Sequence, residues 1–284
     1  EKDVKINGAY YGTPIHFDTL ALFINTKTFA AAGIASYPST WDDLTSAARK
    51  LTVKDEGGKI VTSGIALGTF DNIAHNSDIV SLLLIQNGAD LADLNGKTKQ
   101  NAFDALDFYV SFAKGDSKVW DESIENSKLA FAKGNLAMYF GYSWDIFDLK
   151  AFNPNLEFNV IPVPHLPSRN TTVASYWVEG VSGKTKFPQE SFEFLKFLGS
   201  KETMEKLYAK ESRTRIFGEL YPRSDMADML KSNPLIAPFI EQGKDAQSTI
   251  FSSDTHDEAM VDSLNAYLGN AVNSMLNENT SAQT

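Results

Sequence analysis

Two carboxylates, Asp18 and Glu179, are the side chains of this sequence that suit acid–base chemistry on a sugar bond. A pair of carboxyl groups on either side of a glycosidic bond hydrolyses it, one as an acid and the other as a base or nucleophile. The chain also carries 4 Trp and 10 Tyr, whose polar tips and apolar rings suit a wet binding cleft when they lie in loops. A carbohydrate-active enzyme and a binding protein are therefore both hypotheses at this point.

The sequence lacks the residues and motifs that other common catalytic sites need. The chain has no Cys, which excludes disulfides, thiol nucleophiles and cysteine-type zinc sites. Its 4 His residues have neither the helical spacing nor the companions of a zinc site, and no nucleophile elbow, phosphate-binding loop or dinucleotide fingerprint is present. We expect no metal and no cofactor.

Charge and hydropathy exclude two further classes. The net charge of -10 argues against binding to nucleic acid. The most apolar stretch, residues 79–85, is far shorter than the roughly 20 residues that a membrane span needs. With 284 residues, the chain is long enough for one large domain or two ordinary ones.

The elements that must position these residues alternate between strands and helices, which predicts the α/β class. Thr40 and Asp43 match a capping box at the start of a helix, Ser123 is expected to cap a later one, and Pro188 is expected in the first turn of another. Strands are expected near residues 20–25, 60–67, 136–140, 159–161 and 175–182, and helices near 26–33, 41–51, 79–86, 101–114, 124–133, 188–198, 202–208, 225–230, 235–242 and from 260 onward.

Several segments, taken in order, resemble the extracellular solute-binding proteins of ABC importers, in the family that includes the maltose-binding protein. These segments are residues 20–25 (LALFIN), 29–34 (FAAAGI) with 38–44 (PSTWDDL), 130–138 (AFAKGNLAM) and 161–164 (IPVP). Gly180-Val181-Ser182 and the helix from Phe192 to Leu198 continue the same order. The resemblance covers nearly the whole chain.

The resemblance implies a fold of the periplasmic-binding-protein type II kind, with two lobes joined by a hinge. Residues 1–17 and 178–245 would belong to the first lobe, and residues 21–175 and 250–284 to the second. Hinge crossings are expected near 18–20, 176–178 and 246–250. The first lobe would be incomplete and the chain a fragment, which would leave Phe192, Phe194 and Leu195 uncovered.

The same resemblance implies a function. The protein would bind a mono- or oligosaccharide between its lobes, close around it and deliver it to ABC permease subunits in the membrane. It would be periplasmic or extracellular and not an enzyme, and would touch a membrane only through its partner or a lipid anchor absent from this chain. The resemblance does not identify the sugar or its chain length.

Ligand-binding residues follow from the resemblance position by position. Trp144 falls where the family places a stacking aromatic, with Tyr142 beside it, and Asp18 falls on an acidic ligand-contacting position near the hinge. Trp177 and Glu179 lie at the second crossing, where strand alternation puts both on one face. Phe70 and Asp71 lie in a loop that often contacts ligand. Plainer interpretations remain for each: a core Trp, a solvated turn, or a packed Trp beside a surface Glu.

Overall fold

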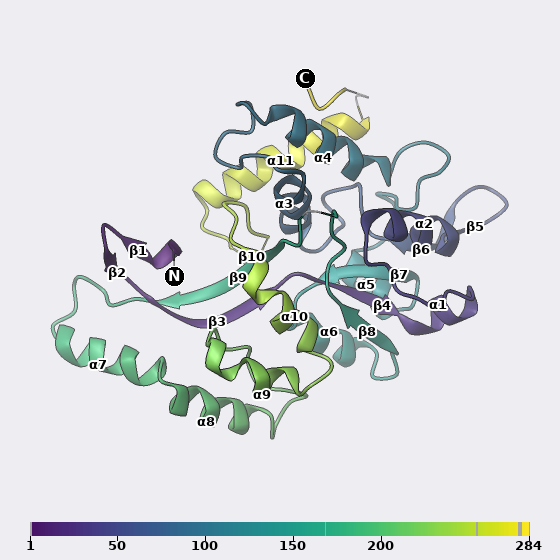
Figure 1. Ribbon diagram of the computed structural model, residues 1–284. Helices are drawn as coiled ribbons and strands as arrows, with labels where there is room; N and C mark the ends of the chain where they lie inside the picture. Colours follow the sequence, from purple (N-terminus) through teal and green to yellow (C-terminus); the bar gives the residue numbers. More distant parts are fainter. Residues whose placement is uncertain (1, 168, 254, 278–279, 284) are drawn as a thin grey trace.

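The computed structural model describes the chain except residues 1, 168, 254, 278–279 and 284. Its main sheet has five strands in the order β5 (Val53–Lys54), β6 (Ile60–Ile65), β7 (Leu136–Gly141), β4 (Ala21–Asn25) and β8 (Phe158–Ile161). β6 and β7 run parallel, whereas β4 is antiparallel to both of its neighbours. We call this sheet and its helices the five-stranded half (Figure 1).

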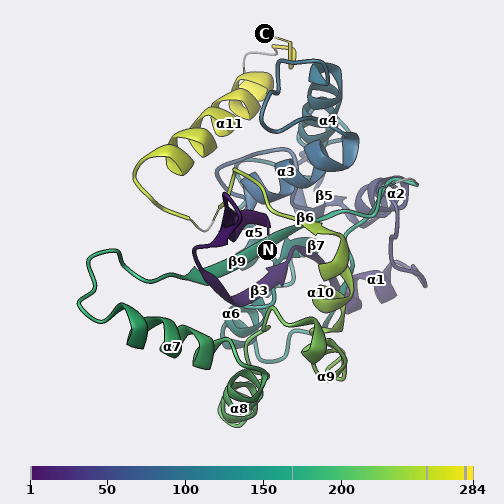
Figure 2. The same ribbon diagram turned by 60° about the vertical axis from the view of Figure 1, so that its left-hand side comes forward.

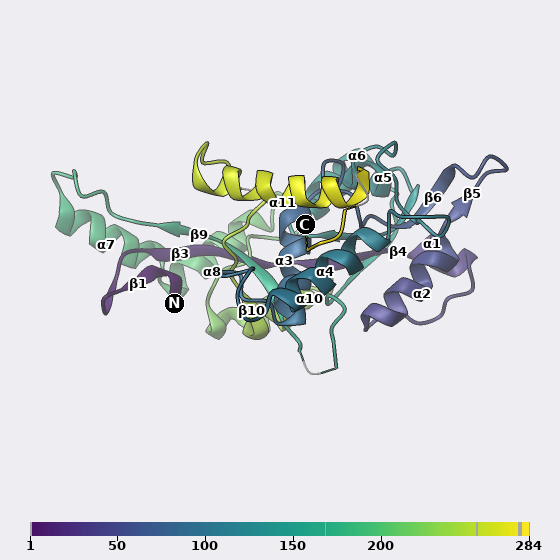
Figure 3. The ribbon, with the colours of Figure 1, turned by 90° about the horizontal axis from the view of Figure 1, so that it is seen from above.

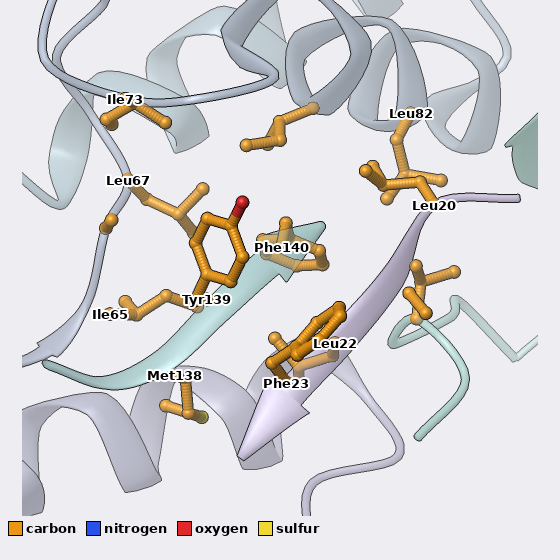
Figure 4. Close-up of a cluster of buried hydrophobic side chains, with 14 of the residues drawn as sticks. Leu20, Leu22, Phe23, Ile65, Leu67, Ile73, Leu82, Met138, Tyr139 and Phe140 are labelled. Atoms are coloured by element: carbon orange, nitrogen blue, oxygen red, sulfur yellow. The ribbon is translucent and has the colours of Figure 1, made fainter. Parts of the chain in front are cut away.

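Both faces of this sheet are covered, because every residue of β4 and β7 is buried. The helices of this half are α1 (Thr26–Ala31), α2 (Trp41–Leu51), α3 (Asn76–Asn87), α4 (Lys99–Ser111), α5 (Ser127–Ala132) and α6 (Asp145–Phe152). Side chains of β4 and β7 alternate between the two faces, so that Leu22 and Phe140 contribute to one part of the core and Phe23 and Tyr139 to another (Figure 4). Continuous apolar strands are typical of a sheet buried on both faces.

Local signals in the sequence set several helix ends as expected. Thr40 Oγ1 accepts the Asp43 N–H and the Asp43 carboxylate accepts the Thr40 N–H, which confirms the capping box of α2. Gly88 ends α3 at φ 84°, a conformation in which a Cβ is strained.

Two predicted helix boundaries were wrong. Ser123 does not cap a helix, because α5 begins at Ser127 and the Asn126 side chain accepts the Lys128 N–H. α4 ends at Ser111 rather than near Lys114, because Phe112 O accepts bonds from Val119 and Trp120 and turns the chain.

The second sheet has three strands in the order β10 (Ala246–Gln247), β9 (Thr172–Glu179) and β3 (Thr13–Thr19). A small hairpin of β1 (Lys5–Ile6) and β2 (Ala9–Tyr10) precedes it. We call this sheet and its helices the three-stranded half; the helices are α7 (Pro188–Leu198), α8 (Lys201–Glu211), α9 (Ala227–Lys231) and α10 (Ala237–Gln242), with short 3-10 turns at Lys2–Val4, Ser224–Met226 and Gly243–Asp245. The last helix, α11 (Met260–Asn277), returns to pack on α3 and α4 (Figure 1).

α7 is the least covered helix of this half. None of its residues is buried. Phe192 and Phe194 are more than half exposed, as the resemblance implied, whereas Leu195 is half-buried rather than uncovered. Figure 2 shows α7 standing beside the rest of the three-stranded half rather than within it.

The chain passes from one sheet to the other at Leu20, between β3 and β4, which follow one another along the length of the molecule (Figure 3). The Leu20 N–H donates to Val173 O, and Leu20 O accepts bonds from the Thr172 hydroxyl and the Gln242 amide. This junction is buried and fully bonded, so the two halves meet at a fixed point of the backbone. Within the described part of the chain, no helix has the length and apolar character to cross a membrane.

Candidate functional site

The two halves meet in a set of aromatic rings. The Trp144 ring stacks on Tyr142, with centroids 4.4 Å apart and planes 17° apart. It also stands 5.2 Å from the Trp177 ring at 81°. Tyr142 and Trp144 belong to the five-stranded half and Trp177 to the three-stranded half. We call Tyr142, Trp144, Trp177 and His16 the aromatic cluster.

The turn after β7 positions Trp144. β7 ends at Gly141, where a Cβ would come within 2.6 Å of both the Asp145 carboxylate and the Tyr139 ring, so a side chain does not fit there. The chain then turns through Tyr142 and Ser143, and Trp144 becomes the N-cap residue of α6. This sharp strand-to-helix turn leaves the Trp144 ring half-buried beside the fully buried Tyr142 ring.

Strand pairing positions Trp177. His16 of β3 pairs with Trp177 of β9, and Asp18 pairs with Ser175. Paired residues share a face of the sheet, and residues two apart on a strand do so as well. His16, Asp18, Trp177 and Glu179 therefore lie on one face, with the His16 ring 6.1 Å from the Trp177 ring. Trp177 is 44% exposed, which leaves ring surface open to a ligand.

The cluster continues to a ring that sequence reasoning missed. The Tyr221 ring lies 5.9 Å from His16. Its hydroxyl donates to Glu211, and burial together with that carboxylate raises the pKa of Tyr221 above its usual range. Tyr221 lies in a polar tract between helices, and only its aromatic character in that tract could have indicated it.

Asp18 is buried at the junction of the two halves. Its two carboxylate oxygens accept the backbone N–H groups of Thr19 and Ser143, each at 2.8 Å. Burial raises the pKa of Asp18 to about 7, against the effect of these hydrogen bonds. Through Ser143, Asp18 ties the end of β3 to the turn that carries Trp144.

A second buried carboxylate, Asp145, follows Trp144 directly. Its Oδ2 lies 2.6 Å from His75 Nε2 and accepts the Tyr139 hydroxyl at 2.5 Å, while its Oδ1 lies 2.6 Å from Lys128 Nζ. Burial alone would raise the pKa of Asp145, but the charges of His75 and Lys128 and their hydrogen bonds hold it well below its usual range. Sequence reasoning missed this network, because its members are distant in the chain.

The remaining predicted site residues lie elsewhere. Phe70 is buried against Gly269 of α11, and Asp71 accepts a bond from Asn273 of the same helix at 3.4 Å.

Glu179 lies at the exposed end of β9, four residues beyond the partner of Asp18. That backbone spacing is about 13 Å along the strand, whereas glycosidases hold their two carboxyl groups roughly 5 to 9.5 Å apart. Asp18 is also buried with both carboxylate oxygens bonded to backbone N–H groups, so the geometry does not favour this pair for hydrolysis.

A cavity of about 630 Å³ lies in the three-stranded half. Its walls include Phe17, Ala174 and Tyr176, which alternate with the residues of the aromatic cluster along β3 and β9. These strand residues lie on the opposite face of the sheet from the aromatic cluster, but Tyr221 borders both the cavity and the cluster. Among the described residues, no group of three or more His, Cys, Asp or Glu could hold a metal ion.

Comparison with known proteins identifies the family of this chain. Residues 2–205 match the family described as bacterial extracellular solute-binding protein. A curated relative, the multiple sugar-binding protein of Streptococcus mutans serotype c (strain ATCC 700610 / UA159), is 23% identical over 220 residues, which are 72% of this chain and 51% of that protein. The chain thus spans about half the length of this relative.

Solved structures share the fold. A cyclo/maltodextrin-binding protein complexed with maltotetraose superposes with a TM-score of 0.76 at 18% identity, over 99% of this chain and 69% of its own. The sugar-binding protein MalE of Xanthomonas citri superposes with a TM-score of 0.76 at 16% identity, over 99% of this chain and 69% of its own. CpMnBP1 with mannobiose bound superposes with a TM-score of 0.70 at 20% identity, over 99% of this chain and 71% of its own. The expected two-lobed fold of the periplasmic-binding-protein type II kind is confirmed.

Proposed function

This chain belongs to the bacterial extracellular solute-binding proteins, and on that premise we propose that it binds a saccharide at the aromatic cluster. The contact between Trp144 and Trp177 carries the proposal, because the two rings come from different halves and stand nearly perpendicular, 5.2 Å apart. Sugars present apolar C–H faces that pack on flat rings and hydroxyl edges that need polar partners. An angled pair of partly exposed rings offers two such faces to one ligand.

Closure would follow from the same geometry. A ligand that touches Trp144 and Trp177 together is bound better when the two halves approach than when they separate. Its higher affinity for the closed state shifts the population toward that state. We propose that residues 1–17 and 178–245 move against residues 21–175 and 250–284, with crossings near 18–20, 176–178 and 246–250. Trp177 of the three-stranded half then lies in a crossing, directly before the part that moves.

The proposed contact residues are Trp144, Trp177 and Tyr142, with Asp18 and Glu179 as polar groups on the same side of the sheet. Phe70 and Asp71 are left out of this set, because one packs under α11 and the other bonds to it. The proteins of this family are binding proteins rather than enzymes, so the saccharide is expected to be released unchanged.

The partner would be the membrane subunits of an ABC importer, which would recognise the closed form. Such a role would place the protein in the periplasm or outside the cell. Attachment to a membrane would run through that partner or a lipid anchor.

The test is thermal unfolding with a panel of maltotetraose, mannobiose, mannotriose and tagatose. A saccharide at 100 times its Kd should add about 2.7 kcal/mol to the free energy of unfolding. We expect at least one saccharide to raise the Tm, and Trp144→Ala to weaken its binding by about tenfold or more. Tyr267→Ala, which removes a ring that is 71% exposed on α11, is the control and should leave binding unchanged. No shift with any saccharide, or equal effects of the two variants, would contradict the proposal.

A further inference from the structure

His75 adopts a left-handed backbone conformation, which is uncommon for residues other than glycine. It lies immediately before α3 at φ 57° and ψ 29°, in the left-handed region. Among the described residues, three that are not glycine have positive φ, and His75 is the one that is buried. Gly adopts this conformation without a Cβ clash, and Asn, like His, is found there more often than most other residues. The position is therefore uncommon but accessible to His, and the contacts of its imidazole show what the side chain does there.

One nitrogen of that imidazole is bound to the turn that carries Trp144. His75 Nε2 lies 2.6 Å from the Asp145 carboxylate, and both side chains are almost fully buried. Asp145 is the residue after Trp144 and also accepts the backbone N–H of Tyr142 at 3.3 Å. The position of the His75 ring is thus fixed relative to the turn.

The imidazole ring also contacts both rings of the stacked pair. The Tyr142 ring meets the His75 ring at 85° with centroids 5.0 Å apart, and the Trp144 ring meets it at 69° and 6.2 Å. Edge-to-face contacts of this kind are favourable and fix the orientation of the rings. His75 therefore borders both members of the stacked pair.

The other nitrogen faces the segment between β10 and α11. His75 Nδ1 lies 3.4 Å from Ser253 Oγ, and that hydroxyl donates to the Asp78 carboxylate at 2.5 Å. The imidazole thus lies between the Trp144 turn on one side and the segment that leads into α11 on the other.

We propose that His75 is a positioning residue for saccharide binding, and that its ring, held by Asp145, keeps the Tyr142–Trp144 stack in the orientation that faces Trp177. The inference rests on the proposed function for its effect on affinity. His75 itself does not contact the saccharide; it acts through Tyr142 and Trp144.

The test uses His75→Asn, because Asn suits the left-handed conformation but is too short to reach Asp145 and has no ring. Two quantities are measured: the part of the near-ultraviolet circular dichroism that Trp144→Phe abolishes, and the Kd of the saccharide from the panel that binds best. We expect His75→Asn to reduce the Trp144 signal by more than half and to weaken binding about tenfold. His256→Asn, at an exposed histidine, is the control and should change neither.

Two experiments distinguish the positioning role of His75 from a role in stability alone. His75→Gln keeps an amide that can donate to Asp145 but lacks the ring, so its urea stability should exceed that of His75→Asn while its Trp144 signal is equally reduced. In a double-mutant cycle, His75→Asn should cost no further affinity once Trp144 is Ala. Full recovery of the signal by Gln, or additive losses of affinity, would overturn the proposal.

The outcomes for the two proposals differ. If no saccharide binds the unaltered protein but His75→Asn and His75→Gln still reduce the Trp144 signal, the proposed function fails and the positioning role stands. If the protein binds a saccharide and neither variant changes signal or affinity, the positioning role fails alone. If His75→Asn does not fold, His75→Gln decides by the same two readouts.

Discussion

Asp18 and Asp145 are buried almost equally and both contact the turn that carries Trp144, yet their carboxyl pKa values move in opposite directions. Asp18 accepts two backbone N–H groups and has no cation among its bonded partners. Asp145 is bonded to Lys128 and His75. Burial penalises the charged form of both, and that penalty prevails at Asp18 but is outweighed at Asp145.

The contrast shows that two backbone N–H groups offset only part of the cost of burying a carboxylate charge. Hydrogen bonds from Thr19 and Ser143 lower the pKa of Asp18, but burial raises it to about 7, and the nearby Asp145 charge adds to the rise. Asp18 therefore takes up a proton near neutral pH, whereas Asp145 stays ionised. The turn that carries Trp144 is tied to one carboxyl that titrates and to another that does not.

The largest expected effect comes from removing the ionised member. Asp145→Ala leaves Lys128 and His75 without their buried counter-charge, and we expect it to lower the free energy of unfolding by about 3 to 5 kcal/mol. Urea denaturation at pH 7 measures this loss. Asp148→Ala is the matched control, since Asp148 also bonds Lys128 but is 54% exposed, and it should cost about 1 kcal/mol or less. Equal losses from the two variants would show that burial does not decide the value of the pair.

The next effect is a pH dependence at Asp18. Its pKa is higher in the folded state than its ordinary 3.8, so the folded state binds a proton that the unfolded state releases. The resulting stability is present below about pH 4 and is lost as the pH rises to about 7, by roughly 2 to 4 kcal/mol. Asp145 has the opposite sign, because its lowered pKa gives stability that is lost as the pH falls below about 4.

Asp18→Asn tests this dependence, since it keeps the shape of the side chain and removes the titration. Urea denaturation between pH 4 and 7 should show a downward slope in the unaltered protein and a flatter profile in the variant. A slope of the same size in both proteins would mean that another group is responsible.

The smallest expected effect concerns one hydrogen bond to the ionised member. Tyr139→Phe removes the hydroxyl that donates to Asp145 at 2.5 Å, and we expect a loss of roughly 1.5 to 3 kcal/mol in urea denaturation, because the acceptor is charged. Tyr37→Phe is the control, since its hydroxyl bonds the neutral and exposed Asn159 side chain. The prediction fails if both variants lose the same stability.

Local chemistry allowed much of the fold to be predicted from the sequence. The capping box at Thr40, the Gly at position 88 and the Pro at position 188 act within a turn or two of chain, and each lies where the sequence indicated. The predicted boundary at Ser123 was wrong because a contact with a distant part of the chain, rather than local chemistry, decides where this helix begins. Ser127 rather than Ser123 is drawn inward, because its hydroxyl accepts the Ala74 N–H from a distant loop.

The candidate site could be predicted only in part. Trp144 and Trp177 were indicated by the resemblance to the family, and the structure brings their rings together. His75, Lys128 and Asp145 carry no mark in the sequence, because their association depends on α3, α5 and α6 meeting at the end of β7. Such buried polar networks are fixed by tertiary packing, which periodicity does not report.

The position of β4 affects how the protein is made. This strand occupies residues 21–25 but pairs on its two sides with residues 136–141 and 158–161. At the usual rates of synthesis, of about 5 to 20 residues per second, β4 leaves the ribosome roughly 6 to 20 seconds before its first partner strand. Throughout that interval an apolar strand has neither edge paired with its native partner, so the unpaired N–H and C=O groups of β4 are open to pairing with the wrong strand.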